Sequence, residues 1–183
     1  MRPVLVITGS PSATSRTARL GAVVLERLST QGFPTTLLDL RTLPAEDLLA
    51  ARTTASALAD AIELVAGASG IVVATPIYKA AYSGLLKAFL DVLPQYGLRE
   101  KIVLPLATGG SVAHVLAIDY ALRPVLSSMD PKHVVQGLFI LDTNITIRDD
   151  GSAELVAEGS SRLDAAIAAF AAALDPPASP DLR

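Results

Sequence analysis

Short apolar runs alternate along this chain with longer segments in which apolar residues recur every three or four positions. The runs are short, rich in aliphatic and β-branched residues and closed by glycine or polar residues, which is typical of strands. Their apolar residues are largely consecutive, which indicates strands buried on both faces, as in a parallel sheet covered by helices. We therefore predict five parallel strands, at residues 4–7, 35–40, 70–75, 101–107 and 134–141.

The segments between these runs carry apolar residues at the period of an amphipathic helix. After the first strand, for example, Leu20, Val23, Val24 and Leu28 share one helical face. The alternation predicts an α/β fold: a flavodoxin-like, doubly wound, five-stranded parallel sheet in the order 2-1-3-4-5, with helices on both faces. The predicted helices span residues 16–31, 46–50, 58–65, 85–93, 112–129 and 161 to just before Pro176.

Local signals add details to this outline. Pro105 cannot donate to a central ladder, so we place it near the end of its strand. Asp149-Asp150-Gly151 predicts a turn within a small hairpin, and Ser161 with Asp164 forms a candidate capping box for the last helix. No linker or repeat divides the chain, so we expect one domain over residues 1–175 and a flexible tail at 176–183.

The composition narrows the chemistry. The 183 residues are 51% apolar, and a net charge of -3 with no run of Lys or Arg argues against nucleic acid as a partner. The absence of cysteine excludes disulfides, thiolate metal sites and a cysteine nucleophile, and the two histidines are too few for a histidine-rich site. Carboxylates could still bind a hard cation, but we predict no metal site. The N-terminal apolar run at residues 4–7 is too short for a signal-peptide core, and the longest alanine-rich stretch, residues 165–174, is about half the length of a bilayer span. We therefore expect a cytoplasmic protein without a membrane segment.

Three polar or turn-forming segments follow predicted strands 1, 3 and 4. In a doubly wound sheet, ligands bind outside the carboxyl ends of the strands, at the point where the strand order reverses, which here lies between strands 1 and 3. We therefore expect the three segments to meet at one rim of the sheet. They are residues 9–17, 75–79 and 108–111.

The first of these segments suits a phosphate. Ser10, Ser15 and Thr17 offer hydroxyl donors, the first amides of the following helix point to the same place, and the helix dipole favours an anion there. Arg16 adds a guanidinium for phosphate oxygens. The segment lacks the Walker lysine and G-x-G-x-x-G patterns, which favours a mononucleotide. The alternative is a Ser/Thr-rich helix cap with an exposed arginine.

The other two segments suit a flat ring. Tyr78 and its backbone could lie beside a planar ligand, or could simply form a β-to-α turn. Gly109 and Gly110 permit close backbone approach, or form a tight turn before a helix. No G-x-S-x-G elbow is present, so an enzyme with this sequence would take its chemistry from a cofactor. Lys87 and Asp91 are spaced as a surface ion pair.

Several segments together resemble the NAD(P)H-dependent FMN reductases, and especially the reductase component of two-component alkanesulfonate monooxygenase systems. The likeness covers residues 4–128, and its middle motif is long and specific. The first segment alone would also fit flavodoxin-like quinone and azo reductases. The matching segments are Gly9-Ser10-Pro11 with Ser15-Arg16-Thr17, and residues 74–87, 104–114 and 119–126.

This resemblance implies an NAD(P)H:FMN oxidoreductase in which a hydride passes from NADPH or NADH to N5 of FMN. The reduced FMN would serve a partner monooxygenase that desulfonates organosulfonates, and related reductases are homodimers or homotetramers. The FMN phosphate would sit on Ser10, Ser15, Arg16 and Thr17. The isoalloxazine would rest against Pro76, Ile77, Tyr78 and Lys79, and against Thr108, Gly109, Gly110 and Ser111.

The resemblance also implies a role for Tyr120 in flavin transfer or at a subunit interface. In the sulfonate-linked members, a tyrosine at this place lies in a π-helical insertion near the flavin, and such insertions often mark functional sites. The alternative is a core or interface aromatic. Residues 12–14 lack an arginine that family members can carry, which leaves the choice between NADPH and NADH open.

Two other functions stay open at this point. One is a flavoenzyme with tightly bound FMN that reduces quinones, azo dyes or metal oxyanions. The other is a non-enzymatic, flavodoxin-like electron carrier. Such carriers usually have a strongly acidic surface and aromatic residues flanking the flavin, whereas this chain has a net charge of -3, no Trp and 4% aromatic residues.

Overall fold

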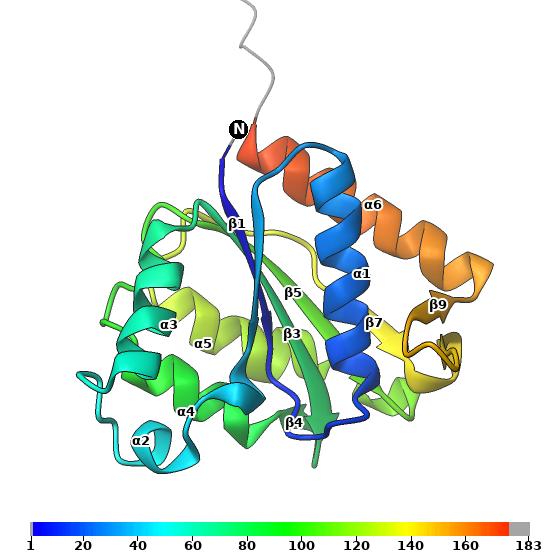
Figure 1. The fold of residues 1–183 in the computed structure, drawn as a ribbon. Helices are drawn as coiled ribbons and strands as arrows, with labels where there is room; N and C mark the ends of the chain where they lie inside the picture. Colours follow the sequence, from blue (N-terminus) through cyan, green and yellow to red (C-terminus); the bar gives the residue numbers. More distant parts are fainter. Residues whose placement is uncertain (1, 176–183) are drawn as a thin grey trace, which may run out of the picture.

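The computed structural model describes residues 2–175 and contains the doubly wound parallel sheet that the sequence predicts (Figure 1). Its strands are β1 (Val4–Thr8), β2 (Thr35–Asp39), β3 (Gly70–Tyr78), β4 (Ala81–Tyr82), β5 (Ile102–Gly109), β6 (His133–Val134) and β7 (Leu138–Leu141). The order is β2-β1-β3-β5, with β6 and β7 both pairing with β5, and β4 pairing antiparallel with β3. With β6 and β7 taken as one interrupted strand, the predicted order 2-1-3-4-5 is confirmed.

Helices cover both faces of this sheet (Figure 1). They are α1 (Arg16–Thr30), α2 (Ala45–Leu49), α3 (Ser56–Gly67), α4 (Gly84–Val92), α5 (Arg123–Ser128) and α6 (Ala157–Leu174). Apolar residues of α1 and α6 pack on one face, and those of α2, α3, α4 and α5 pack on the other. Alternate strand residues supply the two layers: Leu5 and Ile7 of β1 join the second, whereas Val4 and Val6 join the first.

Pro105 lies in the middle of β5, so the prediction that it stands near a strand end is wrong. The ladder on the outer side of β5 breaks at this point: Val103 is the last residue paired with β6, and Leu106 is the first paired with β7. Proline has no N–H to donate to a neighbouring strand. Because the outer ladder is interrupted beside Pro105, no carbonyl of the neighbouring strand lacks a donor there. The predicted fifth strand, residues 134–141, is consequently split in two.

The predicted helix at residues 112–129 is wrong as a single element. A 3-10 turn at Val112–His114 is followed by a π-helix at Ile118–Leu122, and only then by α5. The Arg123 N–H donates to the Ile118 carbonyl, five residues earlier, which is the hydrogen bond that defines a π turn. The Arg123 guanidinium donates to the Val134 and Val135 carbonyls at 3.0 and 3.1 Å. The widened turn is thus tied to the break between β6 and β7.

A small antiparallel hairpin follows the sheet, as the Asp149-Asp150-Gly151 turn predicts. Its strands are β8 (Ile145–Ile147) and β9 (Ala153–Leu155). Gly151 has a φ of 81° in the turn, a conformation that glycine adopts readily. The hairpin packs against α1, so it lies on the same side of the sheet as α6.

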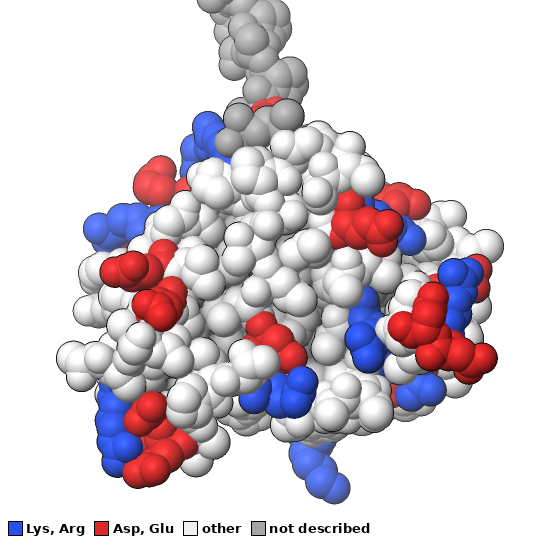
Figure 2. Space-filling model, in the orientation of Figure 1, with Lys and Arg blue, Asp and Glu red and all other residues white. Residues whose placement is uncertain are grey.

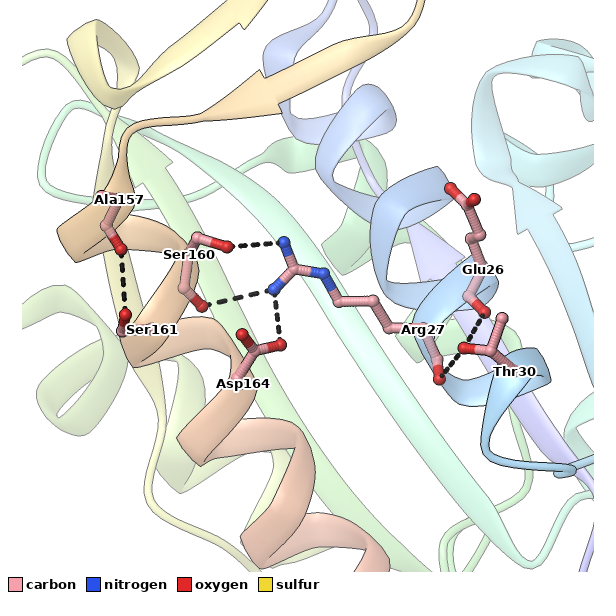
Figure 3. Close-up of polar contacts among 7 residues, drawn as sticks. All are labelled: Glu26, Arg27, Thr30, Ala157, Ser160, Ser161 and Asp164. Carbon is pink, nitrogen blue, oxygen red and sulfur yellow. Dashed lines mark hydrogen bonds and ion pairs between the residues drawn. The ribbon is translucent and has the colours of Figure 1, made fainter.

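The last helix starts at Ala157, earlier than predicted, and the capping box at Ser161 and Asp164 is wrong. Asp164 lies inside α6 and instead accepts a hydrogen bond from Arg27 of α1 at 2.8 Å (Figure 3). The same guanidinium donates to the carbonyl and the hydroxyl of Ser160 at 3.3 and 2.9 Å. These polar contacts join the two helices of one layer. The tail predicted at residues 176–183 lies outside the described residues.

Lys101 is buried just before β5 and secures the end of α3. Its Nζ donates to the Ala66 and Ala68 carbonyls at 2.9 and 2.7 Å. The last carbonyls of a helix have no partner within the helix, so the ammonium supplies the missing donors. Burial lowers the pKa of the Lys101 side chain below its usual value.

Acidic and basic side chains are interspersed on the face shown in Figure 2, with no extended patch of one sign. The surface pair predicted at Lys87 and Asp91 is confirmed, with an Nζ–Oδ1 distance of 2.6 Å. Its hydrogen bond raises the pKa of Lys87. Within residues 2–175, no helix has the length and apolar character needed to cross a membrane.

Candidate flavin site

A cleft of about 360 Å³ opens where the carboxyl ends of β1, β3 and β5 meet the start of α1. Its volume lies in the range usual for small-molecule sites. Of the twelve residues predicted for the flavin site, all but Lys79 and Ser111 line it. The lining residues are Ser10, Ser12, Thr14, Ser15, Arg16, Thr17, Pro76, Ile77, Tyr78, Thr108, Gly109, Gly110 and Asp142.

Hydrogen-bond donors gather at the α1 end of the cleft. Ser15 is the N-cap of α1, and its Oγ accepts from the Ala18 N–H at 3.1 Å. Ser10 Oγ accepts from the Ser12 N–H at 3.3 Å. Because both hydroxyl oxygens act as acceptors, their protons are available to a ligand. The first two N–H groups of α1 have no acceptor within the helix, and its first turn contains no acidic residue. The arrangement favours an anion.

Arg16 adds a positive charge to this end of the cleft. Its side chain is exposed, and its Nε donates to the Ile145 carbonyl of β8 at 3.2 Å. This bond anchors the guanidinium to the β8–β9 hairpin. Its two terminal nitrogens have no hydrogen bond to another described residue, so they can donate to oxygens of a bound phosphate.

The loop that holds these donors is fixed to α4 by Ser83, a residue that the sequence reasoning missed. Ser83 is the N-cap of α4: its Oγ accepts from the Leu86 N–H at 3.1 Å and donates to the Gly9 carbonyl. A Cβ at Gly9 would lie 2.8 Å from Leu86 Cβ, so a larger residue would push the loop away from the helix. The position of Ser83 directly before a helical pattern indicates the N-cap of α4. No sequence pattern indicates its second hydrogen bond, to the Gly9 carbonyl.

Residues 75–78 belong to β3 rather than to a loop, which corrects the predicted strand end. Pro76 pairs in register with Thr108 of β5, and β3 then turns back into β4. Lys79 and Ala80 form this turn with φ values of 51° and 64°, which is unusual for residues other than glycine. The turn carries Lys79 to an exposed tip outside the cleft lining, while Tyr78 is 49% exposed at its edge.

The end of β5 closes the other side of the cleft. The strand continues to Gly109, two residues beyond the prediction. A Cβ at Gly110 would have only Asp142 Oδ2 near it, at 4.0 Å, so the space beside this glycine belongs to the cleft. Ser111 lies outside the cleft lining, where its hydroxyl accepts from the Ala113 N–H at 3.2 Å and caps the 3-10 turn.

Asp142 is the lining residue that no sequence pattern indicated. It follows β7 and starts a 3-10 turn at Asp142–Asn144, so the fold brings it to the cleft from the edge of the sheet. Ser12 and Thr14 complete the lining from the first loop. Within residues 2–175, no group of three or more His, Asp or Glu side chains is placed to hold a metal ion.

Tyr120 occupies the centre of the π-helix and is 79% exposed. The π-helical geometry that the resemblance implies is therefore present. The side chain is not part of the cleft lining. Val112, Val115 and Leu116 are also exposed, which gives this segment an unusual amount of solvent-facing apolar surface.

Comparison with known proteins points to one family. The family model described as NADPH-dependent FMN reductase matches residues 2–145. A protein named FMN reductase (NADPH) from Pseudomonas putida is 44% identical over 176 residues, which is 93% of this chain and 87% of that protein. A protein of the same name from Escherichia coli is 42% identical over 171 residues, covering 93% of this chain and 89% of that one. The apo crystal structure of an NADH:FMN oxidoreductase superposes with a TM-score of 0.86 at 40% identity, covering 98% of this chain and 93% of its own.

Proposed function

The chain belongs to the NADPH-dependent FMN reductase family, and from this premise we propose that it is an NAD(P)H:FMN oxidoreductase that binds FMN in the cleft at the start of α1. One observation carries the proposal. Hydrogen-bond donors at the start of α1, suited to an anion, and the free space beside Gly110 at the end of β5 belong to the same cleft. When bound, FMN supplies the chemistry, because its N5 accepts a hydride from the nicotinamide.

The FMN phosphate fits the α1 end of the cleft. Several hydrogen-bond donors there can bind the phosphate oxygens. They are the free N–H groups at the start of the helix, the hydroxyls of Ser10 and Ser15, and the terminal nitrogens of Arg16. Thr17, in the first turn of α1, completes the set. These groups bind and orient the flavin; none of them needs to exchange a proton during the reaction.

The isoalloxazine fits between the β3 and β5 sides. Pro76, Ile77 and Tyr78 line one side, and residues 108–110 line the other. We place Lys79 and Ser111 at the rim, since both lie outside the lining. The open space beside Gly110 lets the ring approach the backbone closely.

We further propose that FMN is a diffusible substrate and that its reduced form serves a monooxygenase partner of the organosulfonate type. The cleft is open to solvent along the exposed residues 12–14 and Tyr78, which supports exchange of flavin. A tightly bound FMN that reduces quinones or azo dyes is the competing function. As-purified protein that is yellow, with one FMN per chain, would favour that alternative.

A homo-oligomer is part of the proposal, as a dimer or a tetramer. The exposed apolar residues of the segment at 112–120 support it, because a face of this kind is commonly buried between subunits. Light scattering on the purified protein tests the assembly. We also place the reaction in the cytoplasm, where NAD(P)H is available as the electron donor.

The central test follows oxidation of NADPH and of NADH, with and without added FMN. We expect oxidation to depend on FMN and to saturate with it. Residues 12–14 carry no cation that would select the 2′-phosphate of NADPH, so both nucleotides are included. If FMN stimulates neither reaction, the proposed function is wrong.

A further inference from the structure

Two buried threonines connect the first turn of α1 to the end of β5. The Oγ1 atoms of Thr17 and Thr108 lie 2.6 Å apart, and each residue is only 2% exposed. The two residues are 91 positions apart in the sequence, and both line the cleft. Their hydroxyl pair directly connects the α1 end of the cleft, the proposed phosphate site, with the β5 side, where we place the flavin ring.

The pair has one proton more than it uses. Each hydroxyl has one proton to donate and two lone pairs to accept with. One proton is consumed by the bond between the two oxygens, and neither hydroxyl makes another hydrogen bond to a described residue. The second proton is therefore available to a ligand in the cleft.

The chemistry of the ligand decides which threonine releases this proton. Thr17 stands in the first turn of α1, next to Arg16 and among the anion donors. A bound phosphate only accepts hydrogen bonds, so the Thr17 hydroxyl donates to it. The Thr108 hydroxyl must then donate to Thr17, and a hydroxyl that accepts one hydrogen bond becomes a stronger donor in the next.

We propose that Thr108 is a positioning residue for the FMN phosphate, which acts through Thr17 rather than by touching the flavin ring. The proposal rests on the proposed FMN site. It turns the Thr108 side chain toward α1, although its place in the sequence suggested the ring side. Its backbone is suited to the task, because β5 is paired with both β3 and β7 at this point and holds the hydroxyl on a rigid element.

The experiment measures the affinities of FMN and riboflavin, which differ by the phosphate, for the full chain and four variants. Thr108→Val removes the hydroxyl at nearly constant shape, and Thr108→Ser is its matched control because it keeps the hydroxyl. We expect Thr108→Val to weaken FMN binding about 2- to 10-fold, the effect of one lost hydrogen bond, without changing riboflavin binding. Thr108→Ser should restore the affinity for FMN.

The remaining variants, Thr17→Val and the Thr17→Val/Thr108→Val double variant, complete a cycle. We expect Thr17→Val to weaken FMN binding about 10- to 150-fold, because it removes a hydrogen bond to a charged group. The double variant should bind FMN as Thr17→Val does, since Thr108 has no route to the phosphate without Thr17.

Three results would overturn the proposal: unchanged FMN affinity in Thr108→Val, an equal loss for FMN and riboflavin, or losses that simply add in the double variant. If Thr108→Val does not fold, Thr108→Ala replaces it in the same cycle. Failure of the proposed function shows first in the unmodified protein, which would then bind FMN no more tightly than riboflavin.

Discussion

Replacing Arg16 by alanine tests where the flavin phosphate binds. One of the five guanidinium N–H groups is occupied by the Ile145 carbonyl, which leaves the two terminal nitrogens for a ligand. A hydrogen bond to a charged group contributes about 1.5–3 kcal/mol, which corresponds to a loss of FMN affinity of about 10- to 150-fold. Riboflavin has no phosphate, so its affinity should change by less than about twofold.

Fluorescence titration with both flavins measures this difference. Arg19→Ala is the matched control, because it removes the same charge from the same helix at a residue outside the cleft lining. Added salt should reduce the difference between Arg16→Ala and the unmodified protein, since salt screens exposed charges. If the ratio of FMN to riboflavin affinity is the same in Arg16→Ala as in the unmodified protein, the phosphate does not bind at α1.

The other predictions concern the two glycines at the end of β5, the buried Lys101 and the exposed Tyr120. Gly110→Ala should lower FMN affinity about tenfold or more and leave stability nearly unchanged, because its Cβ would enter the cleft. Gly109→Ala should instead lower the free energy of unfolding by about 1–3 kcal/mol, because its Cβ would lie 3.0 Å from Phe139 Cζ. Normal FMN binding by Gly110→Ala in a titration would contradict the first half. Burial lowers the folded-state pKa of Lys101, so between that pKa and the unfolded value the unfolded chain holds more protons and stability rises with pH. Urea unfolding from pH 7 upward should therefore show the unmodified protein gaining stability relative to Lys101→Met as pH rises, and a constant difference would refute this. Tyr120→Ala should alter flavin content, turnover or oligomer size with a stability change within about 0.5 kcal/mol, because the side chain is exposed; if light scattering, flavin content and turnover are all unchanged, Tyr120 has no such role.

The main strands and their order were predictable because they depend on continuous apolar runs separated by helical periodicity. The predictions failed where a single residue interacts with a segment that is distant in the sequence. The sequence predicts Pro105 near a strand end, whereas it lies in the middle of β5, beside the point where the neighbouring strand is split into β6 and β7. The predicted helix at 112–129 is divided into a 3-10 turn, a π-helix and α5, and Arg123, whose N–H closes the π turn, also donates its guanidinium to carbonyls at that same split.

The candidate site divides in a similar way. Ser10, Ser15 and Arg16 could be predicted as neighbours, since they stand in one loop before one helix. Asp142 could not, because only the closing of the sheet brings the end of β7 to the cleft. The predicted capping role of Asp164 is wrong because its partner is not a local backbone group but Arg27 on another helix (Figure 3).

The sequence by itself determined that this chain forms a parallel sheet covered on both faces, with a loop rich in serine and threonine, the proposed phosphate site, after its first strand. These features depend on the spacing of apolar residues and on groups close together in the chain, which local physical chemistry governs. Only the tertiary structure decided that Thr17 shares a hydrogen bond with Thr108 and that a π turn exposes Tyr120. Both depend on contacts between distant segments, whose geometry is set by how the strands pair and how the helices pack on them.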